Sequence, residues 1–149
     1  MLNDILDFVR HEVVSNPSIS DVSSKNLLSF LELIKINEFT KDSLNDVLRT
    51  HSELVVATGW IYDQWVARRE KLHADLYKRF NVELRNSNSG RVTEAAIEAE
   101  IMSETSYVEA FLLSRLYDRL KDAVTVRGKM LEQLSNNTRQ ENRDLEKNA

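Results

Sequence analysis

The chain has 149 residues, of which 42% are hydrophobic and 30% charged, a balance typical of a folded domain rather than a disordered chain. It contains no cysteine, which excludes disulfide bonds and thiolate metal sites. With one proline and three glycines, the composition favours a few long helices, and we predict an all-α protein.

The net charge of −4 conceals a strong asymmetry along the chain. Residues 1–66 hold five Lys and Arg against ten Asp and Glu, whereas residues 67–91 hold seven against three. Residues 92–113 contain five Glu and no Lys or Arg, and residues 114–149 hold eight basic against six acidic residues. Positive charge is therefore concentrated in residues 67–91, where an anionic partner is expected to bind.

The first segment, residues 1–39, is predicted to form a small acidic helical module. Apolar residues recur at helical spacing over residues 2–14, and a turn at Pro17 ends that helix. A second short helix follows, with Ser23 or Ser24 as its N-cap. The first residues lack the basic region of a secretion signal, and no apolar run approaches the roughly 20 residues of a membrane span. We therefore expect a cytoplasmic protein.

The segment 40–137 is predicted to form a long antiparallel helical hairpin. Its first helix is expected over residues 41–85, opened by Thr40 or Asp42, as one helix or as two collinear pieces that meet near Gly59. The middle of this helix is unusually aromatic, with Trp60, Tyr62, Trp65 and Tyr77. Aromatic residues at helical spacing more often fill a core than form a ligand platform, and both interpretations stay open here.

The polar loop 86–90 precedes a short acidic helix, which is expected over residues 93–102 with Thr93 as its cap. The second long helix of the hairpin then opens at Ser106, where Glu109 three residues later completes a capping-box pattern. Its apolar residues recur every three, four or seven positions. The polar tail 138–149 is predicted to be disordered.

Arg127 and Gly128 interrupt the apolar seam of the second long helix. A buried arginine needs an anionic partner because an unpaired buried charge is costly, and we expect that partner to be Glu98, Glu100 or Glu104. A glycine inside a helix costs about 1 kcal/mol relative to alanine unless close packing requires it. The alternative is a surface arginine whose stem lies along apolar neighbours, beside a glycine at a helix contact.

Each long helix carries more apolar residues than one partner helix can cover, which predicts self-association into a homo-oligomer. The predicted subunit seam lies on the second long helix. It consists of Leu113, Leu116, Leu120, Val124, Arg127, Gly128, Leu131 and Leu134.

The motifs of common enzyme sites are missing from the sequence. Its three histidines do not have zinc-binding spacing, and its three glycines never cluster into a phosphate-binding loop. A Ser-His-Asp set has no support without a nucleophile elbow or a fold that forms a pocket. We therefore expect a protein that is not an enzyme and that uses neither a cofactor nor a metal.

The basic segment carries aromatic residues as well as cations, a combination that suits single-stranded nucleic acid. Lys and Arg neutralise phosphates, and aromatic faces stack on bases, each stacked base contributing about 1–3 kcal/mol. The candidate DNA-binding residues are Arg68, Arg69, Lys71, Tyr77, Lys78, Arg79, Arg85 and Arg91. The alternative is an ordinary solvated helix face.

From about residue 44 to residue 139, roughly two-thirds of its length, the chain resembles the UvsY-type phage recombination mediators. The resemblance rests on the order of its parts. A Trp-bearing helix turns basic, a short linker and an acidic Ser/Glu-rich turn follow, and an aromatic-apolar helix then reaches Val126-Arg127-Gly128 and an amphipathic tail. Residues 1–40 fall outside the resemblance.

This resemblance implies a small helical protein of phage origin, in the host cytoplasm, that forms ring-shaped homo-oligomers and binds single-stranded DNA. Such proteins load a RecA-like recombinase onto strands covered by single-strand binding protein, in DNA recombination, repair and replication. The basic patch of the family falls on Lys78, Arg79 and Arg85 here, and Glu83 stands where the family pattern has a second lysine.

Two functions are therefore predicted, from different classes. The first is a recombination mediator that binds single-stranded DNA. The alternative is a structural or assembly protein, such as a scaffold or adaptor, that uses the same helices for self-association and does not bind nucleic acid.

Overall fold

A computed structural model describes residues 1–35 and 43–148, and the described chain folds into five α-helices. The all-α prediction is confirmed. The helices are α1 (Leu2–Ser15), α2 (Asp21–Ile34), α3 (Leu44–Ser87), α4 (Glu94–Ile101) and α5 (Thr105–Lys147). Within these described ranges, no helix is both long and apolar enough to span a bilayer.

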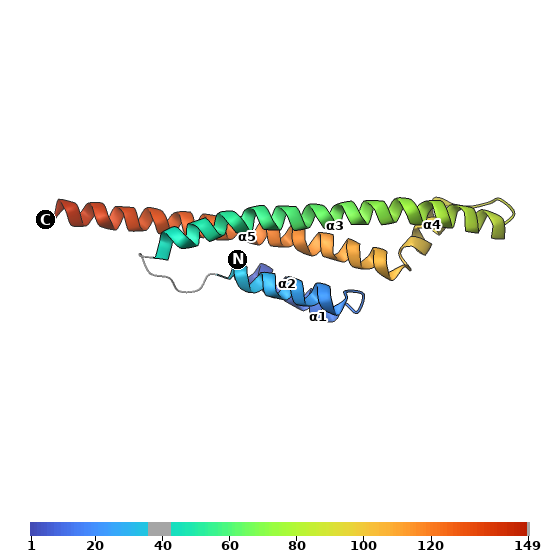
Figure 1. The fold of residues 1–149 in the computed structure, drawn as a ribbon, viewed down its shortest axis with the longest axis horizontal. Coiled ribbons are helices and arrows are strands. Elements are labelled where there is room, and N and C mark those ends of the chain that lie inside the picture. The colour runs from blue at the N-terminus through green and yellow to red at the C-terminus, as the bar shows by residue number, and fades with distance from the viewer. Residues whose placement is uncertain (36–42, 149) are drawn as a thin grey trace.

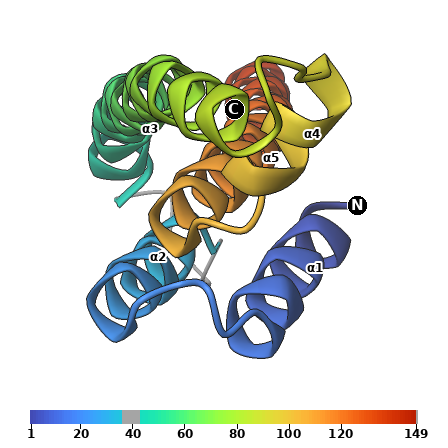
Figure 2. The same ribbon diagram turned by 90° about the vertical axis from the view of Figure 1, so that its right-hand side faces the viewer.

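The two long helices, α3 and α5, lie side by side and run in opposite directions, with α4 and its flanking turns at one end (Figure 1). Seen along the long axis, α5 lies in the centre, with α3 on one side and the α1–α2 pair on another (Figure 2). Helix α5 is thus the element on which the other long helix and the N-terminal pair both pack.

Two of the predicted helix caps differ from the observed ones, and one agrees. The N-cap of α2 is Ser20, whose hydroxyl accepts the Ser23 backbone N–H at 3.3 Å, so the prediction of Ser23 or Ser24 is wrong. Thr93 caps α4 as predicted, accepting from the Ala96 N–H at 3.2 Å. Glu109 does not complete a capping box, because its carboxylate accepts the backbone N–H of Ser20 at 2.7 Å and thereby fixes the start of α2.

Helix α3 passes through Gly59 as one element and ends two residues beyond the predicted boundary at residue 85. Its end is made by Ser89 and Gly90, which both have positive φ angles, 56° and 83°. The Gly90 N–H donates to the Arg85 carbonyl at 2.8 Å, a helix-terminating arrangement in which glycine is favoured. The predicted openings at Thr40 and Asp42 lie outside the described residues.

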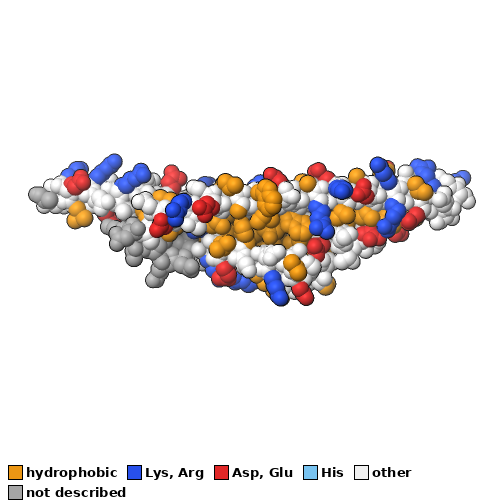
Figure 3. Space-filling view, in the orientation of Figure 1, with side chains coloured by type: hydrophobic (Ala, Val, Ile, Leu, Met, Phe, Trp, Pro, Cys, Tyr) orange, Lys and Arg blue, Asp and Glu red, His pale blue; other side chains and the backbone are white. Residues whose placement is uncertain are grey.

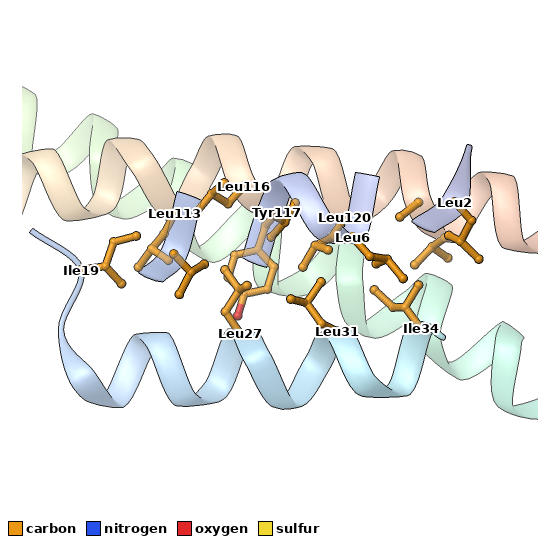
Figure 4. Packing of buried hydrophobic residues seen from close by; sticks show 14 residues of the cluster. Leu2, Leu6, Ile19, Leu27, Leu31, Ile34, Leu113, Leu116, Tyr117 and Leu120 are labelled. Carbon is orange, nitrogen blue, oxygen red and sulfur yellow. The ribbon is translucent and has the colours of Figure 1, made fainter. Parts of the chain in front are cut away.

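The main hydrophobic core lies between α5 and the N-terminal pair (Figure 4). Leu27, Leu31 and Ile34 of α2 point toward the side of α5 that carries Tyr117 and Leu120. From α5, the core also takes Leu113, Leu116, Ala123 and Val124. Four residues of the predicted subunit seam therefore lie in the core of a single chain, because α1 and α2 cover this strip of α5. They are Leu113, Leu116, Leu120 and Val124.

A smaller cluster closes the other end of the hairpin. Ile97 and Ile101 of α4 pack there against Leu76 and Phe80 of α3 and Tyr107 of α5. Helix α4 has only eight residues, and helices this short are not stable alone in water. Its position therefore depends on these two isoleucines and on polar contacts at its edges.

The tail that was predicted to be disordered is helical as far as Lys147. The chain contains no proline or glycine after Gly128, so no residue there interrupts the backbone hydrogen bonds of the helix. In Figure 1 this part of α5 extends past the start of α3, and nearly all of its side chains are exposed. Residue 149 lies outside the described residues.

Candidate nucleic-acid interface

The eight candidate DNA-binding residues divide into those that contact other parts of the chain and those that face solvent. Arg69 belongs to the first group, because its guanidinium donates to the hydroxyl of buried Ser114 on α5 at 3.0 Å. Arg85 also has intramolecular partners: Nε donates to Asn81 Oδ1 at 2.8 Å, and Nη1 lies 3.4 Å from the Gly90 carbonyl. Both residues therefore hold α3 to its neighbours, α5 and the turn that ends the helix.

Tyr77 and Arg79 are engaged by carboxylates. The Tyr77 hydroxyl donates to Glu94 at 2.5 Å, and this hydrogen bond is the main reason why the pKa of Tyr77 is raised. Arg79 donates to Glu104 at 2.9 Å, lies 3.6 Å from Glu83, and stacks over Phe80 with 4.5 Å to the ring centroid. Neither side chain is free to meet a phosphate or a base in this arrangement.

Arg68, Lys71, Lys78 and Arg91 remain exposed, without an ion pair or hydrogen bond to any residue in the described ranges. The Arg68 guanidinium lies over the Trp65 ring, 5.5 Å from its centroid. Spacings of three and seven residues place Arg68, Lys71 and Lys78 on one side of α3. These three are the cations of α3 whose charge is available to an external anion.

Trp60 is an exposed aromatic residue that the prediction did not include in the site. Its side chain is 64% exposed on α3. Lys71 and Lys78 follow it by 11 and 18 residues, close to three and five helical turns, so the three residues lie on one side of the helix. Along the helix axis, Lys71 is about 16 Å and Lys78 about 27 Å from Trp60. In the sequence, the signal that could have placed Trp60 in the candidate site is its helical spacing from Lys71 and Lys78.

We call Trp60, Arg68, Lys71 and Lys78 the outer strip of α3. Asp63 and Asp75 are exposed on the same side, so the local charge is three positive and two negative, or +1. In the view of Figure 3, hydrophobic side chains gather over the middle of the molecule, and Lys and Arg are interspersed with acidic residues toward the α4 end. The outer strip thus combines an aromatic face with a modest positive charge.

The structure places the predicted subunit seam largely inside the chain. Leu113, Leu116, Leu120, Val124, Arg127 and Leu131 are buried, and Gly128 faces His51 of α3. Among the eight seam residues, Leu134 alone is well exposed, at 40%. The assignment of the six buried residues to a subunit contact is therefore corrected, because their side chains are already covered by their own chain.

Among the described residues, Arg127 contacts a histidine and no glutamate. Its Nη1 donates to His51 Nδ1 at 2.8 Å, the side chain is 5% exposed, and Nε has no hydrogen-bond partner among the described residues. The expected carboxylates Glu98 and Glu104 instead contact His73 and Arg79. The predicted ion pair is therefore wrong, although the predicted burial of Arg127 is observed.

His51 should make the stability of the protein sensitive to mild acid. Because a guanidinium only donates hydrogen bonds, His51 Nδ1 must accept, and burial followed by the nearby Arg127 charge lowers the pKa of His51. As the pH falls below about 6.5, the unfolded chain takes up a proton at this position before the folded chain does. Stability should therefore decrease from pH 6.5 downward until the folded-state pKa is passed.

This pH dependence can be measured by urea unfolding between pH 7.5 and pH 5, with His51→Gln as the control. Glutamine keeps an acceptor for Arg127 but does not titrate, so its stability curve should be flatter than that of the parent. Parallel curves for the two proteins would contradict the role given to His51.

Comparison with known proteins found no matching family model, no curated protein and no solved structure similar to this chain.

Proposed function

We propose that the protein binds single-stranded DNA along the outer strip of α3 and acts as a recombination mediator. The observation that carries this proposal is that Arg68, Lys71 and Lys78 share one exposed side of a long helix with an exposed tryptophan. Cations without an ion pair to a described residue can neutralise phosphates without first breaking one, and the indole ring offers a face on which a base can stack.

A homo-oligomer would strengthen this binding. One strip offers few contacts, and binding by a single chain would be weak, whereas several linked strips bind one strand with much higher overall affinity. Self-association is part of the proposal, as are the loading of a RecA-like recombinase and the displacement of single-strand binding protein, which follow from the family resemblance. The exposed Leu134 on α5 is a candidate contact between chains.

The test is the loss of affinity in Lys71→Ala/Lys78→Ala. Two lost phosphate contacts should weaken binding to a labelled oligo-dT about tenfold at physiological salt, and the log–log salt slope should become shallower by about 1.4. Fluorescence anisotropy over a series of salt concentrations measures both quantities. The loss should be the same for all base compositions, because phosphate contacts carry no sequence information.

Lys129→Ala/Lys147→Ala is the matched control, since it removes two exposed lysines of α5 and changes the net charge equally. It should bind nearly as well as the parent. Equal losses in both variants would show that only the net charge matters and would remove the outer strip as the site.

A second function, assembly without nucleic-acid binding, is favoured by a different observation. Val56 and Trp60, four residues apart on one side of α3, are both exposed, and exposed apolar side chains grouped in this way are typical of protein–protein contacts. A parent protein that does not bind oligo-dT even at low salt would support this function over DNA binding.

A further inference from the structure

Acidic side chains of α4 and of the turn that follows it lie against the basic stretch of α3. Tyr77 donates to Glu94 at 2.5 Å, and His73 Nε2 lies 2.8 Å from Glu98 Oε1. Arg79 donates to Glu104 at 2.9 Å. Three α3 side chains within two helical turns are thus each engaged by a different carboxylate.

These carboxylates engage α3 side chains that flank the outer strip. Arg79 lies next to the outer strip in the helical order of α3, and Tyr77 immediately precedes Lys78. A glutamate carboxylate satisfies a guanidinium with the same kind of charge-assisted hydrogen bond that a phosphate oxygen makes. Residues 92–113 contain five Glu and no Lys or Arg, so this segment also repels a phosphate backbone that comes within about one Debye length, about 8–10 Å.

The attachment of α4 rests on few buried side chains. Only Ile97 and Ile101 of α4 are buried, and they pack on the small cluster around Leu76 and Phe80. The polar contacts at its edges are largely exposed, and exposed ion pairs are weakened by solvent and by salt. A competing anion therefore has to displace a short helix with two apolar anchors and a few weak surface bonds.

We propose that α4 and the following turn act as an intramolecular competitor of single-stranded DNA, with Glu94 and Glu104 occupying Tyr77 and Arg79. This inference rests on the proposed function, because it assigns regulation to the same face of α3. A strand bound at the outer strip releases Arg79 and Tyr77 from their carboxylates and then gains both as additional contacts. Binding is thereby restrained until the acidic segment moves.

The experiment compares the parent, Glu94→Gln/Glu104→Gln, and the control Glu132→Gln/Glu146→Gln for binding to labelled oligo-dT over a series of salt concentrations. Both variants change the net charge equally, but Glu132 and Glu146 are exposed residues of α5, in the half of that helix far from α4. The first variant should bind about two- to tenfold more tightly than the parent. Its salt slope should stay close to that of the parent, because Arg79 meets a phosphate in both complexes and only the cost of releasing it from Glu104 is removed.

Each result has one interpretation. Equal tightening in both variants, or no change in Glu94→Gln/Glu104→Gln beside a parent that binds, would overturn the competition and leave the proposed function standing. If neither the parent nor this variant bound oligo-dT at low salt, the proposed function would fail, and the competition with it.

A second measurement on the parent protein does not depend on the folding of a variant. Hydrogen–deuterium exchange of the backbone amides of residues 94–101 should become faster when saturating oligo-dT is added, because α4 is released. Slower or unchanged exchange in a protein that binds the oligonucleotide would overturn the competition.

Discussion

Replacing Leu131 with aspartate is expected to lower the free energy of unfolding by about 3–5 kcal/mol. The Leu131 side chain is 0% exposed in the single chain, so the new carboxylate would be buried without a partner. Small domains are stable by only about 5–15 kcal/mol, and this one change removes a large part of that. Chemical denaturation followed by circular dichroism measures the loss.

Leu134→Asp is the matched control, one helical turn further along α5. Leu134 is 40% exposed, so its replacement should change the free energy of unfolding by no more than about 0.5 kcal/mol. We expect it instead to weaken self-association, which sedimentation velocity would detect. If Leu131→Asp left stability intact while dissociating an oligomer, Leu131 would belong to a subunit contact and not to the core.

Gly128→Ala is expected to destabilise the protein, although alanine is the better helix former. A Cβ at position 128 would lie 2.7 Å from His51 Nε2, so the imidazole ring must move and its bond to Arg127 is lost. Leaving a buried charged donor unsatisfied costs about 1–3 kcal/mol, which exceeds the gain of about 0.5–1 kcal/mol from replacing a helical glycine. Denaturant midpoints should therefore fall.

Two controls isolate the contact between Gly128 and His51. A Cβ added at Gly59 would meet no atom within 4 Å, so Gly59→Ala should stabilise α3 by about 0.5–1 kcal/mol. In a His51→Ala background the obstacle is removed, and Gly128→Ala should also become stabilising. A Gly128→Ala substitution that costs the same with and without His51 would contradict this explanation.

The helices themselves could be predicted from the sequence because their signals are local. Low Gly and Pro content, helical spacing of apolar residues and the Thr93 cap all act within a few residues, and the structure agrees with each. The capping box that was predicted wrongly depends on a distant residue. Glu109 fits a capping box by spacing alone, but its carboxylate bonds instead to Ser20 of another helix.

The candidate site could be predicted only in part, because a basic residue in the sequence does not reveal its partner. Lys71 and Arg79 look equivalent along the chain, yet Arg79 meets a glutamate 25 residues away and Lys71 does not. The same limit applies to the apolar seam. Helical periodicity identifies the strip on α5 but cannot say that α1 and α2, and not another chain, cover it.

The packing of α1 and α2 on α5 has a consequence for synthesis on the ribosome. The α1–α2 pair emerges before α5, so the surface that buries Leu27 and Leu31 belongs to residues made later. The bond between Ser20 and Glu109 spans 89 residues of sequence, which at about 5–20 residues per second take roughly 4–18 s to translate. During that interval two helices of 14 residues each lack the α5 surface that covers their leucines, so the nascent chain exposes apolar side chains that the folded protein buries.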